Sequence, residues 1–410
     1  MKILTIRLID AWLGLPACLV LTLVRQVRDL FSRFRPAIKP ERIAFLKLAE
    51  QGAVVVAWPS IHRAVELVGR QNVYFVTFEQ SRTIVECLDE IPPSNIITIS
   101  TGNLREMIKS GLSALKNLRH LGVDTIVDME FFSCVSASFA YLSGARRRAG
   151  LHRSGGVGPR RGNLMTRPVP YSGQLHTWQL FRIILEAAVT DGLCVDPQQA
   201  AQWPTPQMPR FSPLPQEIAT MQARLSPGAR KRPVVLLNPN CSDLLISRQW
   251  PQTRYAELAR QILACFEDVT VAMTGGREES ADVEELVRQV GSDRCISLAG
   301  KTTFRELMTA YCLGEVLITN DSGPSHFAAL TALDVITLFG PETPQRWSSL
   351  GAGGHVIWAK EWCSPCINPL NGRRSRCRDN ICMQHISVDE VFQEFCRVYR
   401  LRRKAQGEGT

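Results

Sequence analysis

The strongest constraint on the fold is a double series of short apolar runs that alternate with helical patterns. The runs lie at residues 42–48, 73–78, 95–99 and 125–129, and again at 234–238, 269–274, 295–298, 316–319 and 335–339. Buried parallel strands joined by helices produce this alternation. A chain of 410 residues also exceeds one hydrophobic core. We therefore predict an α/β protein with two doubly wound domains.

A proline-rich stretch separates the two series. Five prolines, at 204, 206, 209, 213 and 215, interrupt any periodicity. We predict a Rossmann-like domain at 42–201, a linker at 202–229 and a second Rossmann-like domain at 230–385. A helix at about 388–404 and a basic tail belong to residues 386–410, and this helix could cross back to the first domain.

Residues 1–41 have the pattern of a membrane-associated helical segment. An apolar run at 8–24 precedes a basic stretch, and the segment holds seven Lys or Arg against three Asp or Glu. Such basic flanks favour the anionic, cytoplasmic face of a bilayer. The run is shorter than the ~20 residues that a spanning helix needs, and Pro16 interrupts it. We expect a monotopic anchor, with a single span or a soluble packing helix as alternatives.

Most of the 13 cysteines lie within apolar runs, which is typical of reduced, buried thiols. Four C-terminal cysteines differ in spacing, because a C-x2-C is followed by a C-x4-C. They are Cys363, Cys366, Cys377 and Cys382. A zinc site has this two-knuckle form. A cysteine-rich loop without metal, or a disulfide under oxidising conditions, are the other interpretations.

The densest cluster of small and polar residues in the second series lies at 318–330. An apolar run ends there in Asp321, Ser322 and Gly323, and a helical pattern with His326 follows. Backbone N–H groups at a helix start, the Ser322 hydroxyl and a glycine without a side chain would suit a diphosphate. The plainer interpretation is an Asp or Ser N-cap on a core helix.

Three more segments follow predicted strands of the same domain in the same way. They lie at 238–251, which includes Ser242 and Arg248, at 274–278, which includes Glu278, and at 338–344. Open α/β sheets bind ligands at the carboxyl ends of their strands. The order and placement of all four segments therefore favour a ligand site over an isolated helix cap.

With these motifs the chain resembles the family 9 glycosyltransferases, which include the ADP-heptose:lipopolysaccharide heptosyltransferases, over about residues 42–395. The resemblance implies a GT-B fold, in which two Rossmann-like domains face a central cleft. It also implies an inverting, metal-independent reaction. By position, Asp321, Ser322, Gly323 and His326 would contact the sugar diphosphate, Ser242 and Arg248 would hold phosphate, and Glu278 would lie near the ribose or base. A surface arginine and a helix-start acid are the alternatives for Arg248 and Glu278.

The substrates also follow from the resemblance. The donor would be a nucleotide-diphosphate sugar, with ADP-heptose as the family's example, and the acceptor a lipopolysaccharide or another lipid-linked or surface polysaccharide. The implied location is the cytoplasmic face of the bacterial inner membrane. A cation such as Arg248 would stabilise the departing diphosphate. No Asp-x-Asp motif occurs in the chain, so we expect neither a catalytic metal nor a cofactor.

The expected general base is missing from its usual place. In the heptosyltransferases the first βα turn usually ends in Gly-Asp, whereas this chain has Gly52 followed by Ala53. Glu50 in the same turn is the nearest replacement for a base that deprotonates the acceptor hydroxyl. A solvent-facing role for Glu50, a base at Asp128 or Glu130, and a loss of activity are the alternatives.

A basic stretch between residues 141 and 170 contains no Asp or Glu. Its cationic residues are Arg146, Arg147, Arg148, His152, Arg153, Arg160, Arg161 and Arg167. Together with the net charge of +10, this favours an anionic acceptor or membrane surface, or else a solvated loop. Aromatic residues are sparse in the stretch, so we expect no nucleic-acid partner. A silent nucleotide-sugar-binding scaffold and a nucleotide-sugar epimerase are the competing functions.

Overall fold

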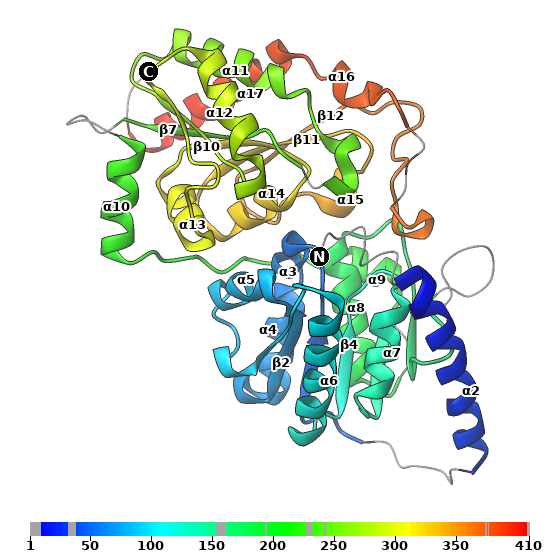
Figure 1. Ribbon diagram of the computed structural model, residues 1–410. Helices are drawn as coiled ribbons and strands as arrows, with labels where there is room; N and C mark the ends of the chain where they lie inside the picture. Colours follow the sequence, from blue (N-terminus) through cyan, green and yellow to red (C-terminus); the bar gives the residue numbers. More distant parts are fainter. Residues whose placement is uncertain are drawn as a thin grey trace. The chain divides into compact units, whose positions relative to one another are not determined.

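The computed structural model describes residues 10–31, 38–152, 161–192, 195–226, 232–241, 243–373, 375 and 377–407. The chain divides into two compact units. The first comprises Met1–Thr205 with Pro369–Gly372, and the second comprises Pro206–Asn368 with Arg373–Thr410. Figure 1 shows a sheet with helices on both of its faces in each unit. The predicted α/β class is therefore confirmed.

The first domain is built on a parallel sheet with the strand order β3-β2-β1-β4-β5-β6. Its strands are β1 (Ile43–Leu46), β2 (Val73–Phe78), β3 (Ile96–Ile99), β4 (Thr125–Asp128), β5 (Arg147–His152) and β6 (Arg167–Pro170). The first four are buried apolar runs that the sequence predicts, as expected for strands covered on both faces. Phe45 and Phe75 stack on one face, with ring centroids 6.3 Å apart.

Helices cover both faces of this sheet. They are α3 (Gln51–Val56), α4 (Trp58–Val68), α5 (Arg82–Cys87), α6 (Leu104–His120), α7 (Cys134–Leu142), α8 (Thr177–Val189) and α9 (Pro197–Ala201). Helix α8 packs on α4, β4 and β5, whereas α6 packs on β3 and α7 on β4. Helices α6 and α7 share a core with Leu46, Val76 and Ile126.

The N-terminal segment forms a helix on the outside of α7. A π-helical turn, η1 (Asp10–Gly14), leads into α2 (Leu15–Phe31), and both contact α7. Figure 1 shows α2 in dark blue beside α7. Among the described residues, no helix has the length and apolarity that crossing a membrane requires.

The second domain has a parallel sheet with the order β12-β11-β10-β7-β8-β9. Its strands are β7 (Val234–Asn238), β8 (Thr270–Met273), β9 (Cys295–Ser297), β10 (Val316–Asn320), β11 (Asp334–Phe339) and β12 (Gly354–Trp358). Its helices are α11 (Gln252–Cys265), α12 (Ser280–Val290), α13 (Phe304–Leu313), α14 (Gly323–Phe327), α15 (Pro344–Trp347), α16 (Ile381–His385) and α17 (Val388–Ala405). Strand β12 is the one strand of this sheet that the sequence patterns missed.

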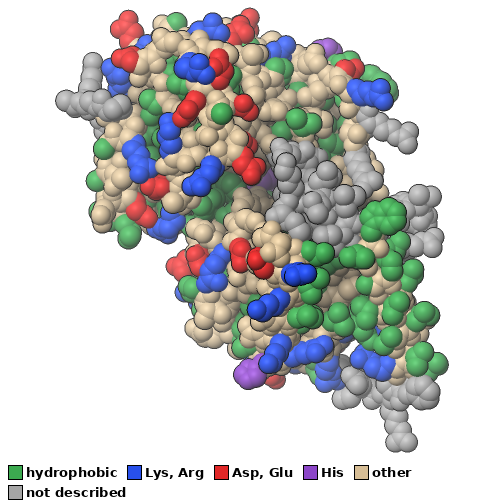
Figure 2. Space-filling model, in the orientation of Figure 1, with side chains coloured by type: hydrophobic (Ala, Val, Ile, Leu, Met, Phe, Trp, Pro, Cys, Tyr) green, Lys and Arg blue, Asp and Glu red, His purple; other side chains and the backbone are tan. Residues whose placement is uncertain are grey.

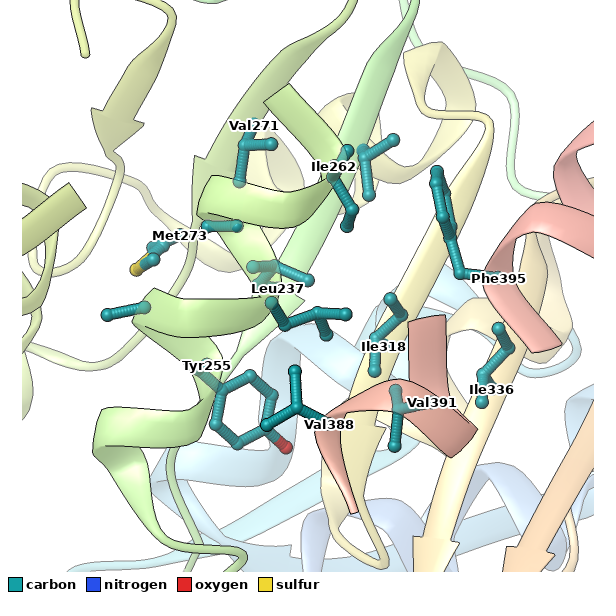
Figure 3. Packing of buried hydrophobic residues seen from close by; sticks show 14 of the residues in the cluster. Leu237, Tyr255, Ile262, Val271, Met273, Ile318, Ile336, Val388, Val391 and Phe395 are labelled. Carbon is teal, nitrogen blue, oxygen red and sulfur yellow. The ribbon is translucent and has the colours of Figure 1, made fainter. Parts of the chain in front are cut away.

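The C-terminal helix belongs to the second domain. Figure 3 shows Val391 and Phe395 of α17 beside Ile318 and Ile336, which project from β10 and β11. Helix α11 completes the same core. The expectation that this helix could cross back to the first domain is not met, because its apolar face is buried on the second sheet.

The predicted linker is partly helical. Helix α10 (Pro215–Leu225) packs against α13, and Arg305 pairs with Glu217 at 2.8 Å. Pro215 is the first residue of α10, a position where the missing N–H costs nothing. The proline therefore begins a helix in a stretch where the sequence analysis expected an irregular connection.

Candidate active site

Asn320, at the end of β10, fixes the loop that carries Arg248. The buried Asn320 amide donates to the carbonyl of Asn240 at 3.1 Å, and its oxygen accepts from the Trp250 backbone N–H at 2.9 Å. The Tyr255 hydroxyl donates to the same oxygen at 3.1 Å. These bonds join the ends of β7 and β10 to η5 (Asp243–Arg248). The loop is thus anchored at both ends to the carboxyl edge of the sheet.

Arg248 and Asp321 form an ion pair at this edge. An Nη1 of Arg248 donates to Asp321 Oδ2 at 3.0 Å and to the Asp321 carbonyl at 2.9 Å. Asp321 is buried, whereas 17% of the Arg248 side chain is exposed. Burial raises the pKa of the Asp321 carboxyl, and Arg248 opposes that rise. Asp321 therefore holds the guanidinium of Arg248, whose outer part stays accessible to a ligand.

Two further arginines surround Asp321, and the sequence analysis did not single them out. Arg346 donates to Glu342 at 2.5 Å, and the Arg373 guanidinium lies 4.8 Å from the centre of the Trp347 ring. Both arginines lower the pKa of Asp321, which its burial raises. Burial also raises the pKa of Glu342. The cluster thus contains three arginines and only two carboxylates, and burial disfavours the ionised form of both carboxylates. Its positive charge would attract a bound anion.

The sequence could have identified Arg346 as a site residue, because it follows the 338–344 segment at the end of β11. No sequence pattern identifies Arg373. It lies in a turn far along the chain, with a left-handed φ of 56°.

His326 is buried in helix α14 and its ring lies 5.9 Å from that of Trp347. Its Nδ1 has no hydrogen-bond partner among the described residues. Burial, with a contribution from Arg248, lowers the pKa of His326 to about 4. The imidazole is therefore neutral near pH 7.

The turn at Ser322 and Gly323 offers fewer amides than the sequence suggested. Helix α14 has only five residues; Pro324 has no N–H, and the N–H of Ser325 donates to the Ser322 carbonyl at 3.2 Å. Ser322 occupies the N-cap position, but its hydroxyl donates to the Asn320 carbonyl instead of capping the helix. Ser322 and Gly323 are half-buried beside the buried Asp321. Side-chain cations must therefore supply most of the attraction for an anion.

The last two residues predicted for the donor site are Ser242 and Glu278. Ser242 is outside the described residues. Glu278 is exposed in η6 (Arg277–Glu279), after β8. The neighbouring Glu279, not Glu278, accepts a hydrogen bond from the Gly276 N–H at the start of η6, at 2.6 Å.

The first domain has its own charged cluster at the carboxyl ends of β1 and β4. The Lys47 ammonium is fully buried and contacts Glu50 Oε2 at 3.1 Å and Glu130 Oε2 at 3.2 Å. The other oxygen of Glu130 accepts from the backbone N–H groups of Leu48 and Ala49, at 2.6 and 3.0 Å. Glu50 has a left-handed φ of 68°, which is unusual for a residue with a side chain.

This geometry separates the three acids proposed from the sequence. Asp128 is fully buried and pairs with Arg161, so it is not accessible to an acceptor. Glu130 holds the first βα turn through two backbone bonds, and 13% of its side chain is exposed. Glu50 is the most accessible of the three, with 27% of its side chain exposed.

Three arginines of the basic stretch are structural, which corrects the expectation that these three contribute to a cationic field for a partner. Arg147 and Arg148 are buried in β5, where Arg147 donates to the Ala188 carbonyl at 3.0 Å and Arg148 to the Leu164 carbonyl at 2.9 Å. Arg161 pairs with Asp128 in the interior. Arg153 and Arg160 are outside the described residues, and Arg146 is exposed.

The four C-terminal cysteines are thiols rather than disulfides. Cys363 and Cys377 are exposed, Cys366 is half-buried and Cys382 is buried. Burial raises the pKa of Cys382 to about 11, and the other three thiols add to the rise. Among the described residues, no group of three or more His, Cys, Asp or Glu is placed to hold a metal ion. The predicted zinc alternative thus has no support in this arrangement.

Curated relatives of this chain are heptosyltransferases. Lipopolysaccharide heptosyltransferase 2 of Salmonella typhimurium is 27% identical over 158 residues, which cover 35% of this chain and 44% of the relative. Lipooligosaccharide heptosyltransferase 2 of Haemophilus influenzae is 30% identical over 130 residues, covering 31% and 37%. The chain thus spans less than half the length of these relatives.

Solved structures share the fold. The Escherichia coli ADP-heptose lipopolysaccharide heptosyltransferase II matches with a TM-score of 0.67 and 17% identity, over 90% of this chain and 100% of that chain. A dodecameric iron-containing glycosyltransferase from enterotoxigenic E. coli matches with a TM-score of 0.50 and 12% identity, over 90% and 78%. These likenesses confirm the predicted GT-B fold.

The family model for glycosyltransferase family 9 (heptosyltransferase) matches residues 113–372. This match includes β7, β8, β10 and β11, with the four polar segments that follow them. The chain belongs to glycosyltransferase family 9, the heptosyltransferase family.

Proposed function

We propose that this protein transfers a sugar from a nucleotide diphosphate to a lipopolysaccharide or another lipid-linked or surface polysaccharide. Heptose carried by ADP is the sugar that the family favours. The observation that carries the proposal is the cationic surplus at the carboxyl edge of the second sheet. There Asp321 holds the partly exposed Arg248, with Arg346 and Arg373 close by.

The leaving group explains why such a cluster is useful. Negative charge builds on the diphosphate as its bond to the anomeric carbon breaks, and a fixed guanidinium stabilises that charge more than it stabilises the bound donor. Arg248 needs little reorganisation for this role because two hydrogen bonds to Asp321 already orient it. Among the described residues, Asp321 Oδ1 has no hydrogen-bond partner, so this oxygen could accept a hydrogen bond from a sugar hydroxyl. Glu278 and Ser242 remain proposed donor contacts by their place in the family motif.

We assign the base to Glu50. In an inverting displacement the base takes the proton of the acceptor hydroxyl while that oxygen forms the new bond to the anomeric carbon, and the diphosphate leaves from the opposite side. The Lys47 ammonium contacts the Glu50 carboxylate at 3.1 Å and so fixes the position of this side chain. Lys47 is a positioning residue here, since it is fully buried.

The finer features of the reaction are part of the same proposal. Guanidinium groups supply the positive charge that a metal ion supplies in other transferases, so we propose a metal-independent reaction. The proposed location is the cytoplasmic face of the inner membrane, which would give the enzyme access to a membrane-bound acceptor.

Transfer of labelled sugar tests the proposal. The purified full chain is incubated with ADP-heptose and with lipopolysaccharide extracted from a strain that lacks heptose, and the label in the lipid fraction is measured. Labelled lipid supports the transferase. Binding of the donor without transfer supports the silent scaffold, the second candidate, which the presence of Ala53 suggests. If the protein neither binds the donor nor transfers the sugar, both candidates are refuted.

A further inference from the structure

Helix α2 presents an apolar face to the outside of the first domain. Eight large apolar side chains of η1 and α2 are at least half exposed, from 50% at Val24 to 82% at Leu30. They are Trp12, Leu13, Leu19, Val20, Leu23, Val24, Val27 and Leu30, and we call them the α2 apolar face. Figure 2 shows hydrophobic side chains gathered over this helix. Contiguous exposed apolar patches on soluble proteins mark interaction surfaces.

The opposite face of α2 holds the helix to the domain, so the apolar face is fixed in orientation. Cys18 is fully buried and its thiol donates to the Cys134 carbonyl at 3.1 Å. Arg25 donates to the Met165 carbonyl at 3.0 Å. Gly162 approaches α2 so closely that a Cβ there would lie 2.3 Å from the Thr22 hydroxyl. Apart from Leu21, which packs partly buried on the core, these inward-facing residues of α2 are small or polar, whereas a surface helix usually turns its apolar side chains inward.

A basic rim lies next to the α2 apolar face. Helix α7 is in contact with α2, and Arg119 of α6 donates to the carbonyl of Leu142 at the end of α7. The rim consists of the exposed cations Arg28, Arg105, Lys109, Lys116, Arg119 and Arg146. Exposed Leu104, Ile108 and Leu112 lie between the cations of α6. Figure 2 shows basic and apolar side chains together on this side of the domain.

The acids of these three helices are already bonded within the protein. Asp10 accepts from the Ser133 hydroxyl and the Val135 N–H, at 2.9 and 2.7 Å. Asp29 pairs with Arg25 at 3.2 Å, and Glu106 accepts from Asn103 at 2.7 Å. The surface consequently combines exposed hydrocarbon with positive charge that these acids offset only in part.

We propose that the α2 apolar face and its basic rim bind the surface of an anionic lipid bilayer, with α2 lying in the plane of the interface. Apolar side chains enter the acyl boundary while Lys and Arg meet anionic headgroups. At about 1.5 Å per residue, α2 spans roughly 25 Å, less than the ~30 Å hydrocarbon core. Because its inner face is bonded to α7, the helix docks without leaving the domain.

A second copy of this chain is the rival occupant of the same face. A symmetric dimer places each surface against its own copy, so the basic rims would meet one another unfavourably. Anionic lipid instead supplies the opposite charge. The proposal is independent of the sugar-transfer function, because every residue in it lies outside the two charged clusters of the candidate active site.

Sedimentation with vesicles tests the proposal on the full chain. Wild-type protein should bind phosphatidylcholine vesicles that contain phosphatidylglycerol, and bind pure phosphatidylcholine more weakly. The triple variant Leu19→Gln, Leu23→Gln, Val27→Gln should lose at least about tenfold in partition, since three apolar side chains no longer enter the bilayer. Leu401→Gln on α17, where the leucine is 55% exposed, is the matched control and should bind as wild type does.

Charge is tested separately. Lys109→Gln with Lys116→Gln should weaken binding to the anionic vesicles by about fivefold per residue, with little change on neutral vesicles. Lys404→Gln on α17 is the control. All variants should keep the wild-type melting temperature, because the replaced side chains are exposed. Vesicle binding that the triple variant leaves unchanged would overturn the proposal. The proposal would also be overturned if the wild-type protein were a dimer that does not bind vesicles and the triple variant were a monomer.

Discussion

Replacing His326 by glutamine tests the environment that the fold imposes on the candidate donor site. The imidazole is 5% exposed, and its Nδ1 has no hydrogen-bond partner among the described residues. Burial and the nearby Arg248 disfavour the imidazolium and lower the pKa of His326 to about 4. An unfolded chain holds the same side chain in water, where its pKa is ~6.5.

The sign of the effect on stability follows from that difference. A pKa that is lower in the folded state means that the unfolded chain binds the proton more tightly. The contribution of neutral His326 is therefore fully present above the unfolded pKa and is lost as the pH falls toward the folded value. Between about pH 7.5 and about pH 4.5, this one group should lower the free energy of unfolding by roughly 2.5 kcal/mol.

Urea denaturation of wild type and His326→Gln at both pH values measures this contribution. Other groups, including Asp321 and Glu342 with their raised pKa values, titrate in both proteins and largely cancel in the comparison. The fall in stability between the two pH values should be smaller in the variant by roughly 2.5 kcal/mol. His120→Gln, at an exposed position on α6, should leave the fall unchanged. An identical pH dependence in wild type and His326→Gln would refute the buried, uncharged imidazole.

Three other predictions concern the reaction and its charges. Glu50→Gln should lower kcat for labelled transfer by about 10² to 10⁴, the usual contribution of a general base, whereas the exposed Glu79→Gln should not; unchanged turnover would eliminate Glu50 as the base. Arg248→Ala should lower the free energy of unfolding in urea by about 3 kcal/mol, because it leaves Asp321 buried without its partner, and adding Asp321→Asn should recover part of the loss. A loss below about 1 kcal/mol would show that the pair is screened by solvent. Chelation with EDTA should leave the transfer rate unchanged, and a loss that added metal reverses would contradict the metal-independent reaction.

The sequence revealed the architecture because the strands are buried on both faces. Residues 43–46 and 234–237 are continuous apolar runs, a pattern that can be recognised in a single sequence. Strands β5 and β6 escaped notice because they contain arginine, histidine and proline. The guanidinium groups of Arg147 and Arg148 donate hydrogen bonds to carbonyls of other segments of the chain. No local sequence pattern predicts such partners. The count of charges along the chain therefore led us to expect these two arginines on the surface, whereas they form hydrogen bonds in the interior.

The candidate site was predicted in the same uneven way. Arg248 and Asp321 stand out because each follows a predicted strand of a parallel sheet, and strand order brings β7 and β10 side by side. Arg373 joins them from a turn more than fifty residues after Asp321, where neither periodicity nor motif marks it. Few backbone N–H groups are free at α14 because this helix has only five residues and a proline in its first turn. From the sequence we expected a longer helix and therefore more free N–H groups.

Binding of ADP to the full chain tests the central claim most directly, since it asks whether the cluster around Arg248 holds a nucleoside diphosphate. Isothermal titration should give saturable binding to wild type, and Arg248→Met should weaken it by about tenfold or more, the equivalent of one charged hydrogen bond. Arg305→Met, which removes the ion pair with Glu217, should bind ADP as wild type does. Equal affinity in the Arg248→Met and wild-type proteins, or no binding to wild type, would contradict the account.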